Sequence, residues 1–475
     1  MSTNIPAEKA ALVLTKLKDQ ANELLSAAHN VQLDMYHAQG SGNFPYYYKD
    51  PATRRFNEKT YVWLNQCLEK RKNGEPVSFE GDYNGKFLRA VTNVSYTLSR
   101  KDQARLNEVK RNALNQQGAL LDAWEEAFGE IPSGKAPING VFEIILKDWV
   151  TKEGTTLQDL LVAPDLFEAL GKAPAAAMPV IPVVGNYLNA IEAGIPLQNA
   201  ISLNNGILKS VRSSINFPSE ANGGVQLNDG TDDFFPEYPF STTQAKILDG
   251  LKSDNSVDIQ MKLSNFNSSD VSLSVSGEAS FKMPLGFFDI DLGASANYFT
   301  NIVTKNSRTI EIDMKFTGVT VAKFGPEPFR VSGRKGWHFA DGIKESIANG
   351  EKDISGFKFS PKPNIDFTEG GDFGVVNAVA FSQYPTMKIK VFSSDYKKIK
   401  TDFDAAANAG LKIDFLGMPL GVGLKGSYKQ GDVSINEAEG SITINVNPPI
   451  EAVAEKAVEA TAFILGVQTE YSAIE

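Results

Sequence analysis

The sequence predicts an α+β multidomain protein, with an N-terminal all-helical bundle and a C-terminal antiparallel β region built from two related modules. Three observations support this fold class. Apolar residues follow helical heptad spacing in the first half, alternate with polar residues in the second half, and are interrupted between the halves by a stretch rich in Pro, Gly, Asn and Asp. A chain of 475 residues is too long for one hydrophobic core, so several domains are expected.

Two long helices with a heptad seam are expected in residues 1–215. The first follows Pro6, carries apolar residues in steps of three and four as far as Met35, and should end near Gly40. The second begins at Ser99, a suitable N-cap, and ends at Gly129. Because heptad seams serve both arrangements, an intrachain bundle is favoured and a coiled coil between chains is the alternative.

The second half contains a short repeat with a period of roughly 130 residues. Its matched segments are 257–261 with 387–391, 279–282 with 409–412, 283–286 with 418–421, and 310–314 with 442–446. In both copies apolar residues alternate with polar ones, as on strands with one buried and one solvated face. We therefore expect two related β modules.

Changes in composition place the domain boundaries. The expected parts are a helical bundle (1–215), a linker with a short helix (216–255), β module 1 (256–325), an insert with a helix (326–385), β module 2 (386–450) and a C-terminal helix (451–475). The last assignment rests on an apolar face with helical spacing between residues 453 and 464.

The charge is distributed unevenly along the chain. The net charge is −10, and residues 1–215 contain 23 basic and 23 acidic residues, so the whole excess of acid lies in the second half. We therefore expect neither duplex nucleic acid nor strongly anionic lipid as a partner of the second half, because phosphates would be repelled, and we predict no nucleic-acid partner for the protein. A single cysteine, Cys67, and the lack of an N-terminal apolar signal core predict a cytoplasmic protein, or one released without a secretory signal peptide.

Residues 173–191 contain no charged side chain, and their length approaches that of a membrane span. Prolines at positions 174, 179 and 182 prevent an unbroken helix. The segment is either a buried, proline-bent connection in the bundle core or a concealed segment that enters a bilayer after a conformational change. The candidates for membrane insertion are Met178, Val180, Ile181, Val183, Val184, Tyr187 and Leu188.

A basic and aromatic sequence in the insert is the candidate site for an anion or another ligand. It comprises Arg334, Lys335, Trp337 and His338 in a glycine-rich stretch. The two cations supply the positive charge that an anion site needs. The favoured interpretation is nevertheless that the aromatic residues of this sequence, Trp337 and His338, anchor the loop structurally.

Two further loops have suggestive compositions. The aromatic loop Tyr46, Tyr47 and Tyr48 has side chains suited to stacking on sugars or bases, or to closing the end of the bundle. The sequence from Asn228 to Asp233 is superficially similar to a calcium-binding loop. It lacks the alternate ligands and the distal glutamate of such loops, so turn chemistry is expected instead.

Few residues are available for catalysis or metal binding. The chain has three histidines and one cysteine, and it contains no nucleophile elbow, phosphate-binding loop or Cys-x-x-Cys pair. His29 and His37 are eight residues apart, which is not the adjacent-turn spacing of helical zinc ligands. We therefore predict no catalytic, cofactor-binding or metal site, although the two acids of a hydrolase would leave no motif.

Three functions are consistent with these patterns. The favoured one is a non-catalytic binding or assembly protein with an acidic β recognition surface, whose partner is another protein or a second copy of the chain. The alternative is a membrane-active, pore-forming toxin-like protein that uses residues 173–191 against a lipid membrane. The second alternative is a small-ligand carrier or an acid/base hydrolase.

Overall fold

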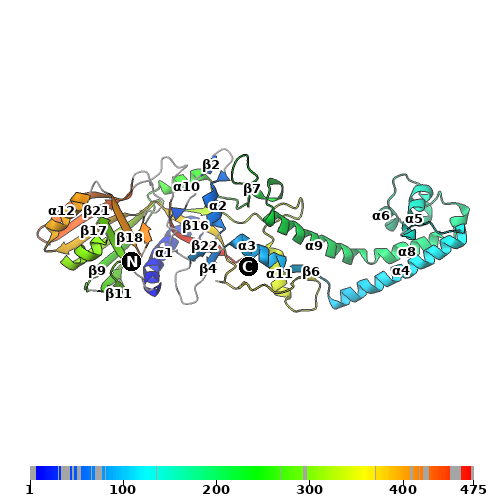
Figure 1. Cartoon of the computed structure of the whole chain (residues 1–475), viewed down its shortest axis with the longest axis horizontal. Coiled ribbons are helices and arrows are strands. Elements are labelled where there is room, and N and C mark those ends of the chain that lie inside the picture. The colour runs from blue at the N-terminus through cyan, green and yellow to red at the C-terminus, as the bar shows by residue number, and fades with distance from the viewer. Residues whose placement is uncertain are drawn as a thin grey trace. The chain divides into compact units, whose positions relative to one another are not determined.

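The computed structural model describes residues 7–29, 31–33, 43–44, 48–50, 55–65, 67–69, 78–80, 82–134, 136–267, 269–292, 297–369, 371–406, 410–416, 418–420, 427–449 and 462–471 (Figure 1). The protein contains both helix and sheet, with a large antiparallel sheet in its C-terminal half. It divides into two compact units. Unit 1 comprises Met1–Val91, Val211–Lys344 and Pro363–Glu475, and unit 2 comprises Thr92–Ser210 and Glu345–Lys362.

Unit 1 is built on a seven-stranded antiparallel sheet. Its strands, in spatial order, are β11 (Phe281–Pro284), β10 (Asp270–Val275), β9 (Ser256–Ser264), β13 (Ser307–Thr317), β17 (Thr386–Ser393), β21 (Ser441–Asn447) and β20 (Lys429–Asn436). Alternate residues of the central strands are buried, as the period-two pattern predicts. The buried face includes Ile259, Ile312 and Ile389.

Two smaller sheets complete the core of unit 1. One contains β12 (Phe288–Leu292), β18 (Leu411–Phe415) and β19 (Met418–Leu420), and the other has the order β1 (Asn43–Phe44), β22 (Ala462–Glu470), β16 (Val375–Ser382) and β14 (Thr320–Lys323). Three hairpins pair β2 (Tyr48–Asp50) with β3 (Arg55–Phe56), β4 (Cys67–Glu69) with β5 (Ser78–Glu80), and β7 (Gly224–Gln226) with β8 (Phe234–Pro236).

Helix α1 (Ala7–His29) packs on sheet rather than on other helices. Its apolar residues Val13, Leu17 and Ala21 are fully buried in the same core as the strands of the seven-stranded sheet. The other helical segments placed wholly or partly in unit 1 are α2 (Glu58–Leu64), α3 (Tyr83–Thr92), the end of α9 (Ile195–Asn216), η3 (Glu220–Asn222), α10 (Gln244–Leu251), η4 (Phe299–Val303), η5 (Thr304–Asn306), α11 (Ala340–Asn349) and α12 (Tyr396–Ala406).

Unit 2 is mainly helical. Its helical segments are α4 (Arg100–Phe128), α5 (Pro137–Ile144), η1 (Ile145–Trp149), α6 (Leu157–Leu161), α7 (Leu166–Ala169), η2 (Ala175–Ala177), α8 (Ile181–Glu192) and most of α9 (Ile195–Asn216). Strand β6 (Val94–Thr97) pairs with β15 (Gly356–Phe359), which the second sequence segment of unit 2 supplies. Helix α8 lies alongside α4, and α5 and α6 lie near the same end of α4 (Figure 1).

The ends of α4 follow the prediction. The Ser99 side chain accepts a hydrogen bond from the Asp102 backbone N–H, and Gly129 ends the helix with a left-handed φ of 79°. The seam residues Leu106 and Leu120 are buried, and Leu120 belongs to the core of unit 2. The other seam residues, Val109, Ala113, Gln116, Ala123 and Ala127, are half-buried, so a bundle built on this seam is not confirmed.

The first helix is shorter than predicted, and residues 1–215 are not all-helical. Helix α1 ends at His29, and residues 31–33 are not helical because the Asn22 side chain bonds to both the backbone N–H and the C=O of Leu33, at 2.6 and 3.2 Å. Strands β1 to β6 also lie in this region. Helices α1 and α4 belong to different units, so a single bundle is not confirmed.

The two predicted β modules do not form separate bodies. Strands β9 and β17, the first strands of the two copies, both flank β13 in one sheet. The middle of the repeat diverges, because Met283 lies in β11 of the seven-stranded sheet whereas Met418 lies in β19 of the three-stranded sheet. The relation between the modules is therefore not confirmed. The helix expected in the insert is present as α11.

The predicted C-terminal helix is wrong where the structure describes it. Residues 462–470 form β22, which pairs with β16 on one side and β1 on the other; residues 450–461 lie outside the described part of the chain. The first six residues of β22 are all buried, so the strand has no period-two alternation. A short apolar run of this kind cannot be distinguished from a buried helix by periodicity.

Candidate functional site

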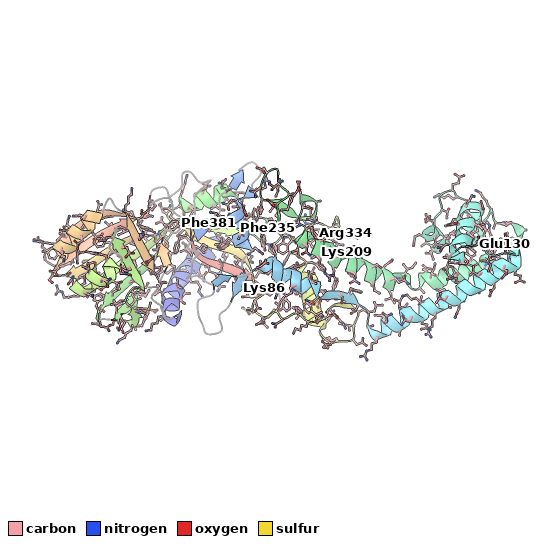
Figure 2. The ribbon with its side chains drawn as sticks, in the orientation of Figure 1. Lys86, Glu130, Lys209, Phe235, Arg334 and Phe381 are labelled. Carbon is pink, nitrogen blue, oxygen red and sulfur yellow. The ribbon has the colours of Figure 1, made fainter. Side chains whose placement is uncertain are left out.

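Unit 2 contains a cleft with a volume of about 480 Å³. Its aromatic floor consists of Trp124 and Phe128 from α4 and Trp149 from the end of η1. Pro132, Ile144 and Pro174 form apolar walls, and Glu130, Asp148 and Lys172 supply the charged groups of the lining. Glu130 lies just beyond the C-terminal end of α4 (Figure 2).

The aromatic floor has a defined geometry. The Trp124 and Trp149 rings stack, with centroids 5.2 Å apart and planes 11° from parallel. The Phe128 ring is tilted by 45° to Trp124 and by 43° to Trp149, at centroid distances of 4.6 and 5.9 Å. Both indoles are almost fully buried. Such contacts stabilise the three rings against one another, so the floor is rigid before any ligand arrives.

Local packing fixes the walls around this floor. Trp124 and Phe128 are four residues apart on α4 and therefore share one face of the helix. The Lys172 backbone N–H donates to the Trp149 carbonyl at 3.0 Å, which holds the chain leading to Pro174 beside the second indole. Helix α5 approaches Pro132 so closely that a Cβ atom on Gly140 would lie 2.7 Å from the Pro132 Cβ.

The stretch of sequence that supplies most of the cleft lining is acidic. Residues 122–172 contain ten carboxylates and four lysines. The lining itself contains two carboxylates, Glu130 and Asp148, and one ammonium group, Lys172. All three residues are exposed. The cleft therefore combines an aromatic floor with an excess of negative charge.

The structure separates the predicted ligand residues of the insert into two packed rings, Trp337 and His338, and two exposed cations, Arg334 and Lys335. Trp337 is fully buried, and its indole N–H donates to the Glu237 carbonyl at 2.8 Å. Residue 338 is partly exposed, but its ring packs 4.7 Å from Phe87, and burial lowers the pKa of His338 to about 3. Arg334 and Lys335 are exposed on the adjacent turn.

Carboxylates lie close to this basic turn. Glu327 forms an ion pair with Arg330, a third cation of the same loop, at 3.3 Å. The pKa of Glu237 is raised by burial and by the nearby Glu327, whereas Lys335 acts in the opposite direction. The positive charge of the turn is therefore partly offset by two acids, which does not favour an anion site there.

Two carboxylates meet on the three-stranded sheet of unit 1. Asp289 on β12 lies opposite Asp414 on β18. Asp289 is 3% exposed, and its Oδ1 accepts from the Ile290 and Thr300 backbone N–H groups at 2.8 and 3.0 Å. The pKa of Asp414 is raised mainly by burial and, to a smaller extent, by the nearby charge of Asp291. No sequence motif marks this pair.

The solvent face of the seven-stranded sheet carries paired charges rather than an acidic patch. Glu311 on β13 lies between Lys262 on β9 and Lys390 on β17, and its carboxylate is 3.4 Å from the Lys262 ammonium. Asp313 lies opposite Lys388. Because opposite charges alternate across these strands, the net negative charge of this half is not concentrated on the central strands of this face.

The segment 173–191 packs inside unit 2 along one face. Among the insertion candidates, Val180, Ile181, Val184 and Leu188 are buried in the unit 2 core, Val183 and Tyr187 are half-buried, and Met178 is exposed. Pro182 lies in the first turn of α8, where proline fits a helix. Across the residues that the structure describes, no helix has the length and apolar character needed to cross a membrane.

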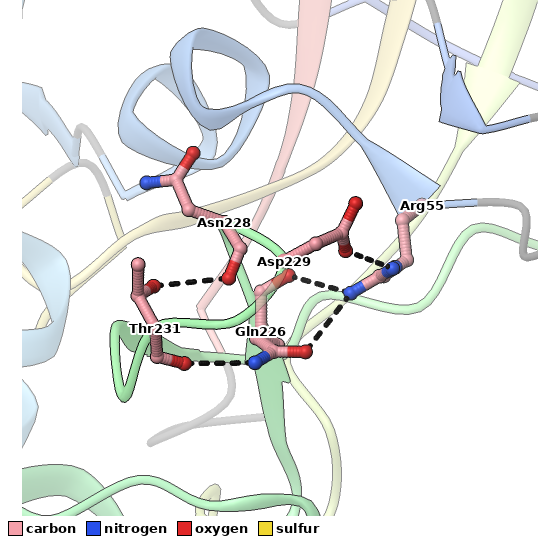
Figure 3. A network of polar contacts seen from close by, with 5 residues as sticks. All are labelled: Arg55, Gln226, Asn228, Asp229 and Thr231. Carbon is pink, nitrogen blue, oxygen red and sulfur yellow. Dashed lines mark hydrogen bonds and ion pairs between the residues drawn. The ribbon is translucent and has the colours of Figure 1, made fainter.

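The two remaining loops have different outcomes. Tyr46 and Tyr47 lie outside the described residues, and of Tyr48 only the backbone, at the start of β2, is described. The loop from Asn228 to Asp233 closes the β7–β8 hairpin through turn hydrogen bonds, including Thr231 Oγ to the Asn228 carbonyl at 2.9 Å (Figure 3).

The carboxylate of Asp229 in this loop forms an ion pair with the Arg55 guanidinium at 2.7 Å. Arg55 also donates a hydrogen bond to the Gln226 carbonyl (Figure 3). The expectation of turn chemistry is therefore confirmed. Over the described ranges, His, Cys, Asp and Glu form no group of three that could hold a metal ion.

Sequence reasoning missed the cleft. Trp124 lies on a heptad helix, where a tryptophan is indistinguishable from an ordinary core residue, and Trp149 joins it only through the fold of α5 and η1. The available signal was two of the chain's four tryptophans within a strongly acidic stretch. No protein-family model, curated protein or solved structure matches the chain.

Proposed function

We propose that this chain is a non-catalytic binding protein and that the cleft in unit 2 is its ligand site. The observation that carries the proposal is the cleft itself, about 480 Å³ in volume with Trp124, Trp149 and Phe128 as its floor. Small-molecule sites typically have volumes of roughly 300–1,000 Å³, an apolar lining and a few polar groups that orient the ligand. The cleft has all three properties.

Binding is favoured over hydrolysis by the exposure of the acids. A general acid must hold its proton near neutral pH, which in carboxylates requires burial or a neighbouring negative charge. Glu130 and Asp148 are both exposed. Asp289 is almost fully buried, but it lies on a strand of unit 1 rather than in this cleft. Its Oδ1 already accepts hydrogen bonds from two backbone N–H groups.

Fluorine NMR of protein labelled with fluorotryptophan tests the proposal directly. The four tryptophans give four signals, of which Trp124 and Trp149 report on the cleft and Trp63 and Trp337 are internal controls in unit 1. Titration with a library of small organic cations, anions and neutral compounds should shift the two cleft signals saturably. Saturable shifts confined to the control signals, or none at all, would refute the proposed function.

Membrane activity is the second candidate, favoured by exposed apolar side chains in unit 2. Val162, Phe167 and Met178 are each about half exposed or more. If they touch lipid, the protein should release dye from neutral liposomes, and a triple serine variant should not. Leu203→Ser, at a comparably exposed position, is the matched control. Absent leakage from the wild type, or equal leakage from the triple variant, would remove this candidate.

A further inference from the structure

We propose that the outer face of α4 is the interface of an antiparallel dimer between two copies of this chain. The outer face is the side of α4 opposite Leu106, Leu120 and Trp124, which are buried. Helix α8 lies along the buried side and shares the unit 2 core with Leu120 and Trp124 (Figure 1). The interface is therefore distinct from the heptad seam of α4, and the inference does not depend on a ligand in the cleft.

The residues of the outer face form one exposed stripe. They recur in steps of three and four between positions 100 and 125, which places them on one side of the helix. Its charged and large apolar members are Arg100, Arg111, Leu114, Asp122 and Glu125. Leu114, near the middle of the helix, is 65% exposed. The stripe therefore has cations in its first half, an exposed apolar residue near its centre and carboxylates in its second half.

The charges of α4 as a whole are divided in the same way. Residues 100–114 contain five basic and two acidic residues, and residues 115–128 contain three acidic and no basic residues. The net charges of the two halves are therefore +3 and −3. A second copy of the helix running in the opposite direction places the basic half of each copy against the acidic half of the other. A parallel copy would place like charges together.

This division of charge opposes the dipole of the helix. Acids in the first turn and bases in the last turn stabilise a helix, because its N-terminus is partially positive and its C-terminus partially negative. The first turn of α4 contains Arg100 and Lys101, with Asp102 as its only acid. The last turn contains Glu125 and Glu126 and no base. The arrangement is unfavourable in one helix and becomes favourable beside an antiparallel copy, whose dipole is also reversed.

The charges of the outer face have no ionic partner within the described part of the chain. Neither the cations Arg100 and Arg111 nor the carboxylates of Asp122 and Glu125 form an ion pair with another described residue. A long polyanion would be attracted by one half of the stripe and repelled by the other. A second copy pairs with both halves, and a two-fold axis makes each contact twice.

One register brings the charges and the apolar centre together. A two-fold axis that crosses α4 between Leu114 and Gly118 places Arg111 of each copy beside Asp122 and Glu125 of the other, with the two Leu114 side chains close to the axis. Exposed ion pairs are individually weak, and one helix face offers a small contact area. We therefore expect a reversible dimer that is populated at protein concentrations of about 100 μM.

Sedimentation equilibrium of the full chain, over a concentration series that reaches this value, measures the association. The mass of the wild type should rise above that of one chain with concentration and fall when salt is added. Arg111→Glu and Glu125→Arg should each weaken dimerisation about 2- to 30-fold, because each lost ion pair occurs twice in a symmetric dimer. Arg105→Glu makes the same charge change at an exposed position off the outer face, and this matched control should have the smaller effect.

Mixing the two charge-reversed variants tests the complementarity itself. In their heterodimer, the charge at position 111 of each copy is again opposite to the charge at position 125 of the other. An equimolar mixture should therefore dimerise about as tightly as the wild type, although neither variant does so alone. All three substituted positions are exposed, so the variants should keep the fold. A wild type that stays monomeric throughout the series, a mixture no tighter than its separate components, or an equal loss with Arg105→Glu would overturn the proposal.

Discussion

Asp289 and Asp414 lie directly opposite each other on the neighbouring antiparallel strands β12 and β18. Like charges at such positions destabilise a sheet. Asp289 has a structural role at this position, because its Oδ1 accepts a hydrogen bond from the backbone N–H of Thr300 in the covering segment η4. Burial is the main cause that raises the pKa of both carboxyls.

This pair makes the stability of unit 1 depend on pH in a defined direction. The folded-state pKa of Asp289 is raised above its unfolded value, so the free energy of unfolding falls as pH rises from about 4 through the folded pKa, and stays lower above it. Asp289→Asn should therefore raise the free energy of unfolding at pH 7 by about 0.2–1 kcal/mol and lose this advantage near pH 4.

Urea unfolding followed by circular dichroism at both pH values measures this difference. Asp254→Asn, at an exposed position, is the control and should change little at either pH. If Asp289→Asn is equally or more destabilised at pH 7 than at pH 4, the ionised Asp289 carboxylate carries no net cost in the folded protein.

His338 should produce a pH dependence of the opposite sign. Burial lowers its folded-state pKa to about 3, below the unfolded value of about 6.5, so stability is complete above pH 6.5 and is lost as pH falls below it. This loss should amount to as much as about 1.4 kcal/mol per pH unit and be absent in His338→Phe.

The slope of unfolding free energy between pH 6.5 and 4.5 is the quantity to compare for these two proteins. Tyr83→Phe removes the hydroxyl 2.9 Å from His338 Nε2 but keeps the imidazole, and it should retain the wild-type slope. Identical slopes in wild type and His338→Phe would show that His338 protonates without cost to the fold.

Substitutions of two leucines on α4, one buried and one exposed, distinguish the effect of core packing from that of self-association. Leu120 is fully buried and Leu114 is 65% exposed. Leu120→Ala should lower the free energy of unfolding by about 2–5 kcal/mol, and Leu114→Ala should change it by less than about 0.5 kcal/mol. Thermal unfolding measures both.

The same contrast determines how assembly is tested. Leu17 and Leu120 are both fully buried, so polar residues there would unfold the protein rather than dissociate a coiled coil. Leu114→Ser is the informative variant. A change in solution mass with Leu114→Ser at unchanged stability would mean that α4 associates between chains through its outer face rather than through its seam.

Alanine substitutions at Gly118 and Gly140 should change the stability of the protein in opposite directions. In α4, a Cβ on Gly118 would meet nothing within 4 Å, so Gly118→Ala should stabilise the helix by about 0.5–1 kcal/mol. In α5, the Cβ of Gly140→Ala would lie 2.7 Å from Pro132, so this substitution should destabilise unit 2 by about 1–3 kcal/mol and move a wall of the cleft. Stabilisation by Gly140→Ala would show that Pro132 moves freely.

The parts of the fold that local chemistry determines were predictable. The bounds of α4 follow from the Ser99 cap and from Gly129, and the central strands β9, β13 and β17 of the seven-stranded sheet follow from alternation, because each has one buried face. β22 was missed because its first six residues are all buried, which removes the alternation. The early end of α1 depends on a side chain, Asn22, that bonds to a residue eleven positions away.

The candidate site was less predictable than the fold. The basic and aromatic sequence at residues 334–338 proved to contain a structural anchor at Trp337 together with two exposed cations. The cleft depends on bringing Trp149 and Pro174 to one face of α4, which no local pattern encodes. Trp124 is a core residue of unit 2, and only tertiary packing also places it at the base of the cleft.

Fluorine NMR of the fluorotryptophan-labelled chain, titrated with small organic compounds, tests most directly the central claim that the cleft of unit 2 is a ligand site. The predicted result is a saturable shift of the Trp124 and Trp149 signals, while the Trp63 and Trp337 signals stay unchanged. Saturable shifts confined to Trp63 and Trp337, or no shift with any compound, would contradict this claim.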